Sequence, residues 1–275
     1  MTAQLQPTPA EAYQDYFAPA IFEPMARELI TCAPPDAGDR VLDVACGTGI
    51  VARRAAAITG PAGRVTGVDI NPGMIAVARA QQRPDDVPIE YVHGDALALD
   101  LPDETYDVAY CQHGVQFFPD RPAGLREMRR VLRDGGRVAI AAWQGLDRHP
   151  LYAALTGAEL PHLTAFGVNV TRADVVAPFS LGDRDLLASL LSDAGFRRIE
   201  IVARSIEARF ATPDRFVERM EYAYAAVVPK FAEDPDLFAA YLARINVETK
   251  EIVERHRHGD RVVVPMHALV AVAHA

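Results

Sequence analysis

The sequence contains few of the residues that mark several classes of protein. It has three cysteines in 275 residues, Cys32, Cys46 and Cys111, and none of them forms a Cys-x-x-Cys pair. An odd number of unpaired cysteines predicts a reducing compartment. Lysine and arginine number 28, against 37 for aspartate and glutamate, so the net charge is −9. Because phosphate binding draws on clustered cations, we do not expect a nucleic acid partner.

Long apolar runs, targeting segments and common hydrolytic motifs are also missing. No stretch reaches the roughly 18 apolar residues of a membrane span, and residues 1–17 have neither the basic nor the apolar region of a signal peptide. We therefore expect a cytoplasmic protein without a membrane span. The motifs His-Glu-x-x-His and Gly-x-Ser-x-Gly do not occur, and there is no zinc-binding cysteine cluster. The sequence therefore predicts no metal site and no Ser-His-Asp hydrolysis.

The strongest pattern present is VLDVACGTGIVA, at residues 41–52. A short apolar run includes Asp43, passes through Gly47 and Gly49, and leads into an alanine-rich helical pattern. Glycine suits such a turn because it tolerates a positive φ and lets a ligand approach the backbone closely. We predict a strand, a tight turn that seats a ligand, and a helix.

A second predicted strand, residues 64–69, supports this interpretation. It ends at Asp69, 20 positions after Gly49, where a bound ribose would need a hydrogen-bond acceptor. Residues 70–80 then resume a helical pattern. The two strands and the helix between them therefore fit a βαβ unit.

The glycine spacing leaves more than one class of function open. Residues 47–52 satisfy the loose Gly-x-Gly-x-x-Ala pattern of dinucleotide-binding folds, which permits an NAD(P)-dependent oxidoreductase. Asp43 disfavours that alternative, because a carboxylate beside the ligand suits a cation and would repel a pyrophosphate. A non-catalytic protein that only binds the cofactor is a third hypothesis.

The segment DVACGTG, residues 43–49, resembles the first motif of class I methyltransferases that use S-adenosylmethionine. The usual pattern is Asp/Glu-x-Gly-x-Gly-x-Gly, and Ala45 stands where the first glycine is common. The resemblance spans about residues 39–143. It is closest to the small-molecule methyltransferases of ubiquinone and menaquinone biosynthesis. It implies S-adenosylmethionine or its product S-adenosylhomocysteine as the cofactor and leaves the methyl acceptor unspecified.

This resemblance also implies roles for individual residues. Asp69 would bind the ribose, and Ile70 and Met74 would pack on the adenine. Asp95 would accept a hydrogen bond from the adenine amino group while the N–H of Ala96 donates to the ring, which matches the donor and acceptor of a purine edge. The complete expected cofactor set is Tyr16, Asp43, Ala45, Gly47, Gly49, Asp69, Ile70, Met74, Asp95, Ala96 and Gln112.

A sulfonium donor needs an aligned acceptor and the exclusion of water rather than a covalent residue. A base helps when the acceptor is a hydroxyl group, and histidine suits that role near neutral pH. His113 follows the predicted strand 108–112, whose carboxyl end opens on the ligand crevice of a doubly wound sheet. We predict His113 as base or substrate contact, with plain packing as the alternative. Tyr222, Tyr224 and Phe210 would suit an aromatic or lipophilic acceptor.

The expected fold is α/β, a doubly wound, seven-stranded, mostly parallel sheet with an antiparallel edge hairpin and a helical lid. A helix over residues 121–132 is expected to stop at Gly135 and Gly136. The hairpin pairs residues 198–210 with residues 262–273. The expected parts are N-terminal helices that cover the cofactor with Tyr16 (1–36), the cofactor-binding core (37–145), a lid insertion (146–180), the completion of the sheet (181–211 and 261–275) and a helical lid or dimer surface (212–260).

Overall fold

The computed structural model describes residues 8–83, 86–225, 231 and 234–275. The chain divides into two compact units, each made of three segments. We call the first the sheet unit, which comprises Phe22–Gly145, Pro178–Ser205 and His267–Ala275. We call the second the helical unit, which comprises Met1–Ile21, Leu146–Ala177 and Ile206–Met266.

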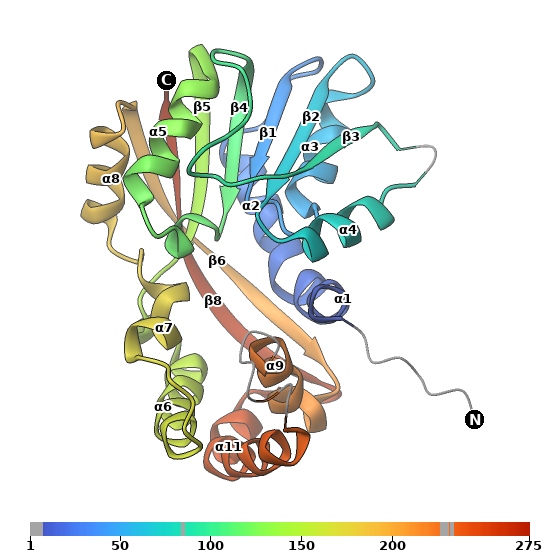
Figure 1. Cartoon of the computed structure of the whole chain (residues 1–275), viewed down its shortest axis with the longest axis vertical. Helices are drawn as coiled ribbons and strands as arrows, with labels where there is room; N and C mark the ends of the chain where they lie inside the picture. Colours follow the sequence, from blue (N-terminus) through green and yellow to red (C-terminus); the bar gives the residue numbers. More distant parts are fainter. Residues whose placement is uncertain (1–7, 84–85, 226–230, 232–233) are drawn as a thin grey trace. The chain divides into compact units, whose positions relative to one another are not determined.

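A mostly parallel sheet organises the fold, in the order β3-β2-β1-β4-β5-β8-β6, with β7 paired to β8 (Figure 1). The strands are β1 (Arg40–Val44), β2 (Arg64–Asp69), β3 (Ile89–His93), β4 (Tyr106–Gln112), β5 (Leu132–Trp143), β6 (Arg197–Ala211), β7 (Arg257–His258) and β8 (Arg261–His274). Strands β1 to β5 pair in parallel, and β8 pairs antiparallel with β5.

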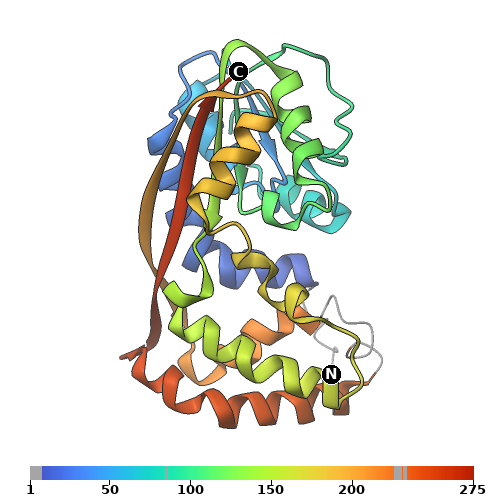
Figure 2. The ribbon, with the colours of Figure 1, turned by 90° about the vertical axis from the view of Figure 1, so that its left-hand side faces the viewer.

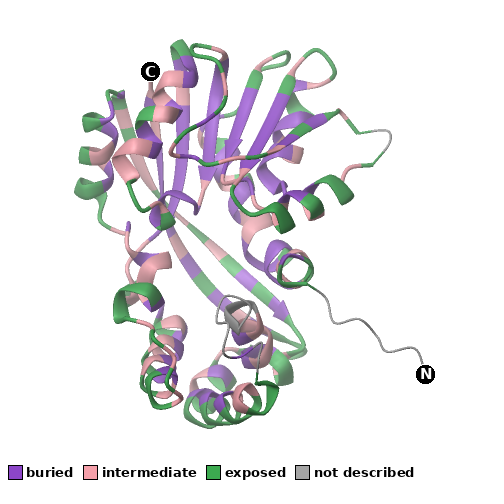
Figure 3. Ribbon diagram, in the orientation of Figure 1, coloured by how far each residue is buried: buried purple, intermediate pink, exposed green. Residues whose placement is uncertain are grey.

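The burial of each strand follows its sequence. Strands β1, β4 and most of β5 are near-continuous apolar runs, as expected for parallel strands covered on both faces, and Figure 3 shows them buried along most of their length. Strand β6 lies at the edge of the sheet, and its residues alternate between exposed and less exposed positions. Burial of one face is typical of antiparallel strands, whose other face can be solvated.

The expected α/β class and antiparallel edge pair are confirmed, because β8 and β6 are neighbours at one edge and run in opposite directions in Figure 1. The expected strand number was wrong, since the described part of the chain forms a sheet of eight strands rather than seven. The additional strand is the two-residue β7, which pairs Arg257 with Val262 and His258 with Arg261. It forms where the chain reverses at Gly259, which has a φ of 61°.

Helices of the sheet unit pack in pairs. They are α2 (Glu23–Cys32), α3 (Ile50–Thr59), α4 (Pro72–Ala80), α5 (Arg121–Val131), α8 (Arg184–Asp193) and the short η2 (Val115–Phe117). Helix α2 contacts α3, and α5 contacts α8, as Figure 2 shows for the latter pair. Asn71, Asp120 and Asp183 cap α4, α5 and α8, because each side chain accepts from main-chain N–H groups of the first turn.

The junction of α5 with β5 differs from the sequence expectation. Helix α5 ends at Val131 and β5 begins at the next residue, so Gly135 and Gly136 lie within the strand and do not stop the helix. The reason is that this segment pairs with β4. The pairing starts at Leu132, opposite Tyr106, and resumes at Arg137 after a shift in register. An irregularity of this kind accommodates the positive φ of Gly135, 77°.

The helical unit is built around aromatic and aliphatic side chains. Its described helices are α1 (Pro9–Ala12), the π-helical η1 (Tyr13–Phe22, whose last residue belongs to the sheet unit), α6 (Pro150–Ala165), α7 (Arg172–Val176), α9 (Phe216–Ala225), α11 (Pro235–Arg255) and the short η3 (Leu146–Arg148) and η5 (Pro213–Arg215). The short η4 (Ala177–Phe179) begins at the last residue of the segment Leu146–Ala177 and continues into the sheet unit. The rings of Tyr16, Phe17, Phe210 and Phe216 pack together within this unit. None of the described helices combines the length and the apolar character needed to cross a membrane.

Candidate active site

The glycine loop, residues 45–49, connects β1 to α3. Ala45, Gly47 and Gly49 have φ angles of 55°, 54° and 81°, so three of five residues adopt a left-handed conformation. A Cβ at Gly49 would overlap the Tyr91 hydroxyl, so that position also needs glycine for space. Ala45 adopts the positive φ at a cost of about 1–2 kcal/mol. The alanine therefore occupies a conformation for which the related motif uses glycine.

Asp43 is a buried carboxyl group in β1, and only 1% of its surface is exposed. Its Oδ2 atom accepts a hydrogen bond of 2.9 Å from the N–H of Ala52, on the first turn of α3. Burial raises the pKa of Asp43 to about 8; the Ala52 N–H opposes this rise, and the charge of Asp69 adds to it. Ionised Asp43 would therefore be stabilised by a nearby cation.

Asp69, the last residue of β2, connects that strand to the glycine loop. Its Oδ2 accepts from the N–H of Gly47 and its Oδ1 from the N–H of Asn71, both at 2.8 Å. Burial raises the pKa of Asp69, and these two N–H groups oppose the rise. The structure thus brings Asp69 to the glycine loop, and the role in ribose binding that the 20-residue spacing from Gly49 indicates stays a prediction.

The residues expected near an adenine follow β2 and β3 at the same edge of the sheet. Ile70 leaves 66% of its surface exposed. Asp95 is exposed and accepts from the N–H of Leu97 at 2.9 Å, whereas Ala96 is buried. His93 connects the two strand ends, since its Nε2 lies 2.9 Å from the carbonyl oxygen of Ile70. Met74, on the first turn of α4, is half-buried.

The end of β4 carries Gln112 and His113. The Gln112 amide nitrogen donates to the carbonyl oxygen of Phe22 at 3.0 Å. His113 is 6% exposed and has a φ of 54°. Its imidazole stacks on the indole of Trp143, with ring centroids 3.8 Å apart and an angle of 12° between planes, and the Phe22 ring lies 6.0 Å away.

Sequence reasoning did not identify Trp143, Phe22 or His93 as part of this region. Trp143 had one usable signal, because it is the only tryptophan of the sequence and directly follows the apolar run of residues 138–142. Phe22 and His93 had no signal in the sequence, since their contacts join segments that are distant along the chain.

The structure gathers most of the predicted residues at the carboxyl edge of the sheet unit. These are Asp43, Ala45, Gly47, Gly49, Asp69, Ile70, Met74, Asp95, Ala96, Gln112 and His113. Tyr16 belongs to the helical unit, where its ring lies 5.3 Å from Phe210 and 5.0 Å from the guanidinium carbon of Arg219. Phe210 is fully buried and Tyr222 is half-buried, whereas the side chain of Tyr224 lies outside the described residues.

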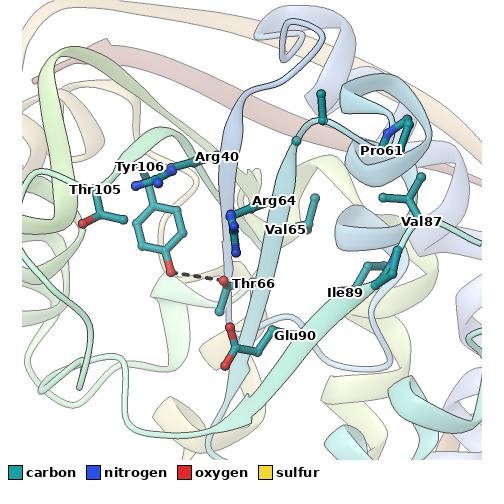
Figure 4. Close-up of a pocket in the computed structure, with 13 residues that line it drawn as sticks. Arg40, Pro61, Arg64, Val65, Thr66, Val87, Ile89, Glu90, Thr105 and Tyr106 are labelled. Carbon is teal, nitrogen blue, oxygen red and sulfur yellow. Dashed lines mark hydrogen bonds between the residues drawn. The ribbon is translucent and has the colours of Figure 1, made fainter.

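A groove of about 660 Å³ lies at the opposite, amino edge of the same strands (Figure 4). Arg40 and Arg64, the first residues of β1 and β2, face each other in register there, and the Tyr106 hydroxyl donates to Thr66 at 3.1 Å. The groove therefore does not belong to the edge that carries the glycine loop. No group of three His, Cys, Asp or Glu residues in the described ranges could hold a metal ion.

Comparison with known proteins identifies the family. A model of the methyltransferase domain matches residues 42–140. The 2-phytyl-1,4-naphtoquinone methyltransferase of Synechococcus elongatus is 41% identical over 120 residues, 43% of this chain and 49% of that protein, so the match spans about half of that relative. The ubiquinone/menaquinone biosynthesis C-methyltransferase of Escherichia coli is 31% identical over 182 residues, 63% of this chain and 72% of that protein.

The chain belongs to the class I S-adenosylmethionine-dependent methyltransferases. The resemblance of residues 43–49 to the first motif of this family is thereby confirmed. The solved structure of a putative methyltransferase from Bacillus halodurans has a similar fold, with a TM-score of 0.57. The match covers 90% of this chain and 97% of the other, at 19% sequence identity.

Proposed function

We propose that this methyltransferase transfers a methyl group from S-adenosylmethionine to oxygen, nitrogen or carbon of a small aromatic or lipophilic molecule. The observation that supports this most is the hydrogen bond that the N–H of Gly47 donates to Asp69. It joins the carboxylate expected to bind the ribose to the glycine loop. The two quinone methyltransferases named above support the class of acceptor, because both names refer to lipophilic aromatic compounds.

The residues at this edge fit the cofactor chemically. Each carboxylate oxygen accepts more than one hydrogen bond, so Asp69 could bind two ribose hydroxyls in addition to its two N–H donors. Asp43 would stabilise the positive charge of the bound cofactor. Exposed Ile70 offers an apolar surface for one face of an adenine. Asp95 and Ala96 would bind its edge, and Met74 would pack against it.

Bound S-adenosylmethionine supplies an activated methyl group, and the protein has to align the acceptor and exclude water. His113 would contact the acceptor and remove its proton where a hydroxyl group is methylated. Tyr16 would cover the cofactor, and the lid segments 146–180 and 212–260 would bind the acceptor. These roles are proposals that substitutions can test.

The two alternatives have less support. An oxidoreductase would place a pyrophosphate near buried Asp43, whose ionised form would be stabilised by a sulfonium and would repel an anion, and the family match does not favour this reaction. A non-catalytic member of the family would retain cofactor binding without turnover. The alternatives therefore differ in ligand preference and in product formation.

Thermal unfolding with S-adenosylhomocysteine and with NADH tests the proposal first. S-adenosylhomocysteine at 100 times its dissociation constant should stabilise the protein by about 2.7 kcal/mol, and NADH should have no effect. Asp69→Ala should weaken cofactor binding by roughly 2–4 kcal/mol in calorimetry, since charge-assisted hydrogen bonds are lost. Asp134→Ala is a control, because that side chain is 96% exposed. Stabilisation by NADH alone would refute the proposal.

Turnover is tested with a panel of acceptors that includes 1,4-naphthohydroquinone, other phenols, amines and hydroxylated lipids. Mass spectrometry should detect S-adenosylhomocysteine and a product heavier by one methylene unit. Cofactor binding without any product across the panel would favour the non-catalytic alternative.

A further inference from the structure

The stacked rings of His113 and Trp143 come from the carboxyl ends of adjacent strands. Strands β4 and β5 are parallel neighbours, with Gln112 paired to Ala141. The N–H of His113 donates to the carbonyl oxygen of Ala141 at 2.9 Å, which extends the pairing one residue beyond the end of β4. The main chain therefore fixes both rings at one edge of the sheet, and they meet with centroids 3.8 Å apart.

The turn that carries His113 lies against the glycine loop. A Cβ at Gly114 would lie 2.6 Å from the Cβ of Ala45 and 2.7 Å from the Sγ of Cys111, so only glycine fits there. His113 itself has a φ of 54°, a conformation that non-glycine residues rarely adopt and that is enriched at functional sites. Close packing on the glycine loop thus accompanies a strained backbone at the histidine.

The contact with Trp143 determines the plane of the imidazole. Stacked aromatic rings interact through their faces, whereas the imidazole nitrogens lie in the ring plane and point along it. The Phe22 ring lies 6.0 Å from the imidazole at 58°, and the Phe22 carbonyl is bound to the amide of Gln112. Two aromatic side chains on fixed backbone segments therefore limit rotation of the His113 ring.

We propose that Trp143 is a positioning residue, whose indole holds the imidazole of His113 in the orientation in which it meets the methyl acceptor. This inference rests on the proposed function, because it takes His113 as the acceptor's base or contact. It adds a residue that acts on the acceptor only through His113 and has no role in cofactor binding.

A double-mutant cycle tests the proposal with 1,4-naphthohydroquinone or another acceptor that the wild-type protein methylates. Trp143→Leu should lower kcat about 10- to 100-fold, since a misplacement of about 1 Å can cost that much, and should leave the KM for S-adenosylmethionine unchanged. Trp143→Phe should restore most of kcat, because it keeps an aromatic face. In the His113→Ala background, Trp143→Leu should cause no further loss.

Two measurements separate positioning from general stability. Phe196→Leu removes another ring buried in the core of the sheet unit, and it should lower the melting temperature without lowering kcat. Because the chain has one tryptophan, its fluorescence reports on Trp143 alone, and His113→Ala should change that emission. An unchanged emission would contradict the stacked arrangement in solution.

The remaining outcomes distinguish this inference from the proposed function. Two outcomes refute the positioning role and leave the proposed function standing, provided that the wild-type protein methylates an acceptor. In the first, Trp143→Leu has the kcat of the wild-type protein. In the second, the loss of kcat caused by Trp143→Leu adds fully to the loss caused by His113→Ala. If the wild-type protein binds the cofactor and methylates nothing, the proposed function is refuted and the positioning role with it.

Discussion

Asp43 shows how one buried carboxyl group can link stability to pH. Its pKa is raised by burial to about 8, whereas an unfolded chain holds an aspartate pKa near ~4. Between these pH values the folded state binds more protons than the unfolded state. The contribution of Asp43 to stability is therefore complete below about pH 4 and is lost as the pH rises to about 8.

Asp43→Asn should remove this dependence, because the amide cannot ionise and its oxygen can still accept from Ala52. We expect the variant to gain roughly 1–3 kcal/mol relative to the wild-type protein between pH 5 and pH 9. Melting temperatures over that range measure the gain, with Asp134→Asn as the exposed control. Parallel curves for wild type and Asp43→Asn would show that Asp43 titrates normally.

Gly49→Ala should destabilise the protein for two separable reasons. Its φ of 81° strains any other residue, and the new Cβ would overlap the Tyr91 hydroxyl. We expect a loss of about 1–3 kcal/mol in denaturant unfolding, together with weaker binding of S-adenosylhomocysteine. Gly38→Ala is a matched control, since its φ is 89° and nothing lies within 4 Å of the added Cβ.

The two glycine variants should differ by the cost of the overlap. Tyr91→Phe should recover part of that cost in the Gly49→Ala background, because it removes the hydroxyl. Equal losses for Gly49→Ala and Gly38→Ala would show that the loop shifts to accommodate the methyl group.

The sequence predicted residues whose roles depend on local chain geometry. Gly47, Gly49 and Asp69 were found because a turn between strand and helix, and an acid at the next strand end, leave a fixed spacing. Trp143 lies beside His113 because β4 and β5 pair, and Phe22 lies near it because the Phe22 carbonyl accepts a hydrogen bond from Gln112. No local sequence pattern encodes either contact. The local motif was therefore predictable, and its aromatic neighbours were not.

At the scale of elements, a buried pair of carboxyl groups joins three helices of the helical unit. Glu159 on α6 is 8% exposed and Glu221 on α9 is 2% exposed. The Tyr241 hydroxyl, from α11, donates to Glu221 at 2.7 Å. Burial raises the pKa of both carboxyl groups, and repulsion from Glu221 raises that of Glu159 further. A proton held between them therefore stabilises the contact.

Glu159→Gln should stabilise the helical unit at alkaline pH. Raised pKa values mean that the folded state retains protons that the unfolded chain releases, so stability falls as the pH rises above the usual range of glutamate. The amide keeps a hydrogen-bond donor without the charge, so the variant should lose less helicity between pH 6 and pH 9 in thermal melts. Glu251→Gln, at a side chain 88% exposed, should match wild type. If both variants match wild type, the pair carries no net charge penalty.

Element boundaries followed the sequence where caps and periodicity agreed. Helix α11 begins where the sequence places a capping residue before a proline, since Asp234 accepts from the N–H of Leu237 and Pro235 is the first helical residue. The start of β5 and the π-helical winding of η1 were missed. Pairing with β4 extends β5 over residues expected to stop a helix, and a pattern with period 3.6 does not distinguish a π-helix from an α-helix.

At the scale of the whole molecule, the alternation of strands and helices predicted the sheet, because parallel neighbours require crossover connections. The division of the chain could not be predicted in the same way. Each unit takes three separate segments, and the boundaries at Ile21/Phe22 and Ser205/Ile206 fall inside continuous helical and strand structure. Only tertiary contacts separate such segments, since no linker composition marks them.

Each unit has its own buried core, so we expect calorimetry to resolve two unfolding transitions. All expected cofactor residues except Tyr16 lie in the sheet unit. S-adenosylhomocysteine at 100 times its dissociation constant should therefore raise the transition of the sheet unit by about 2.7 kcal/mol in stability. Asp69→Ala should abolish the shift. If both transitions move together, Tyr16→Ala tests whether Tyr16 accounts for the shift of the helical unit. Loss of that shift in the variant would assign the contribution to Tyr16. A shift of the same size would assign it to other residues of the helical unit.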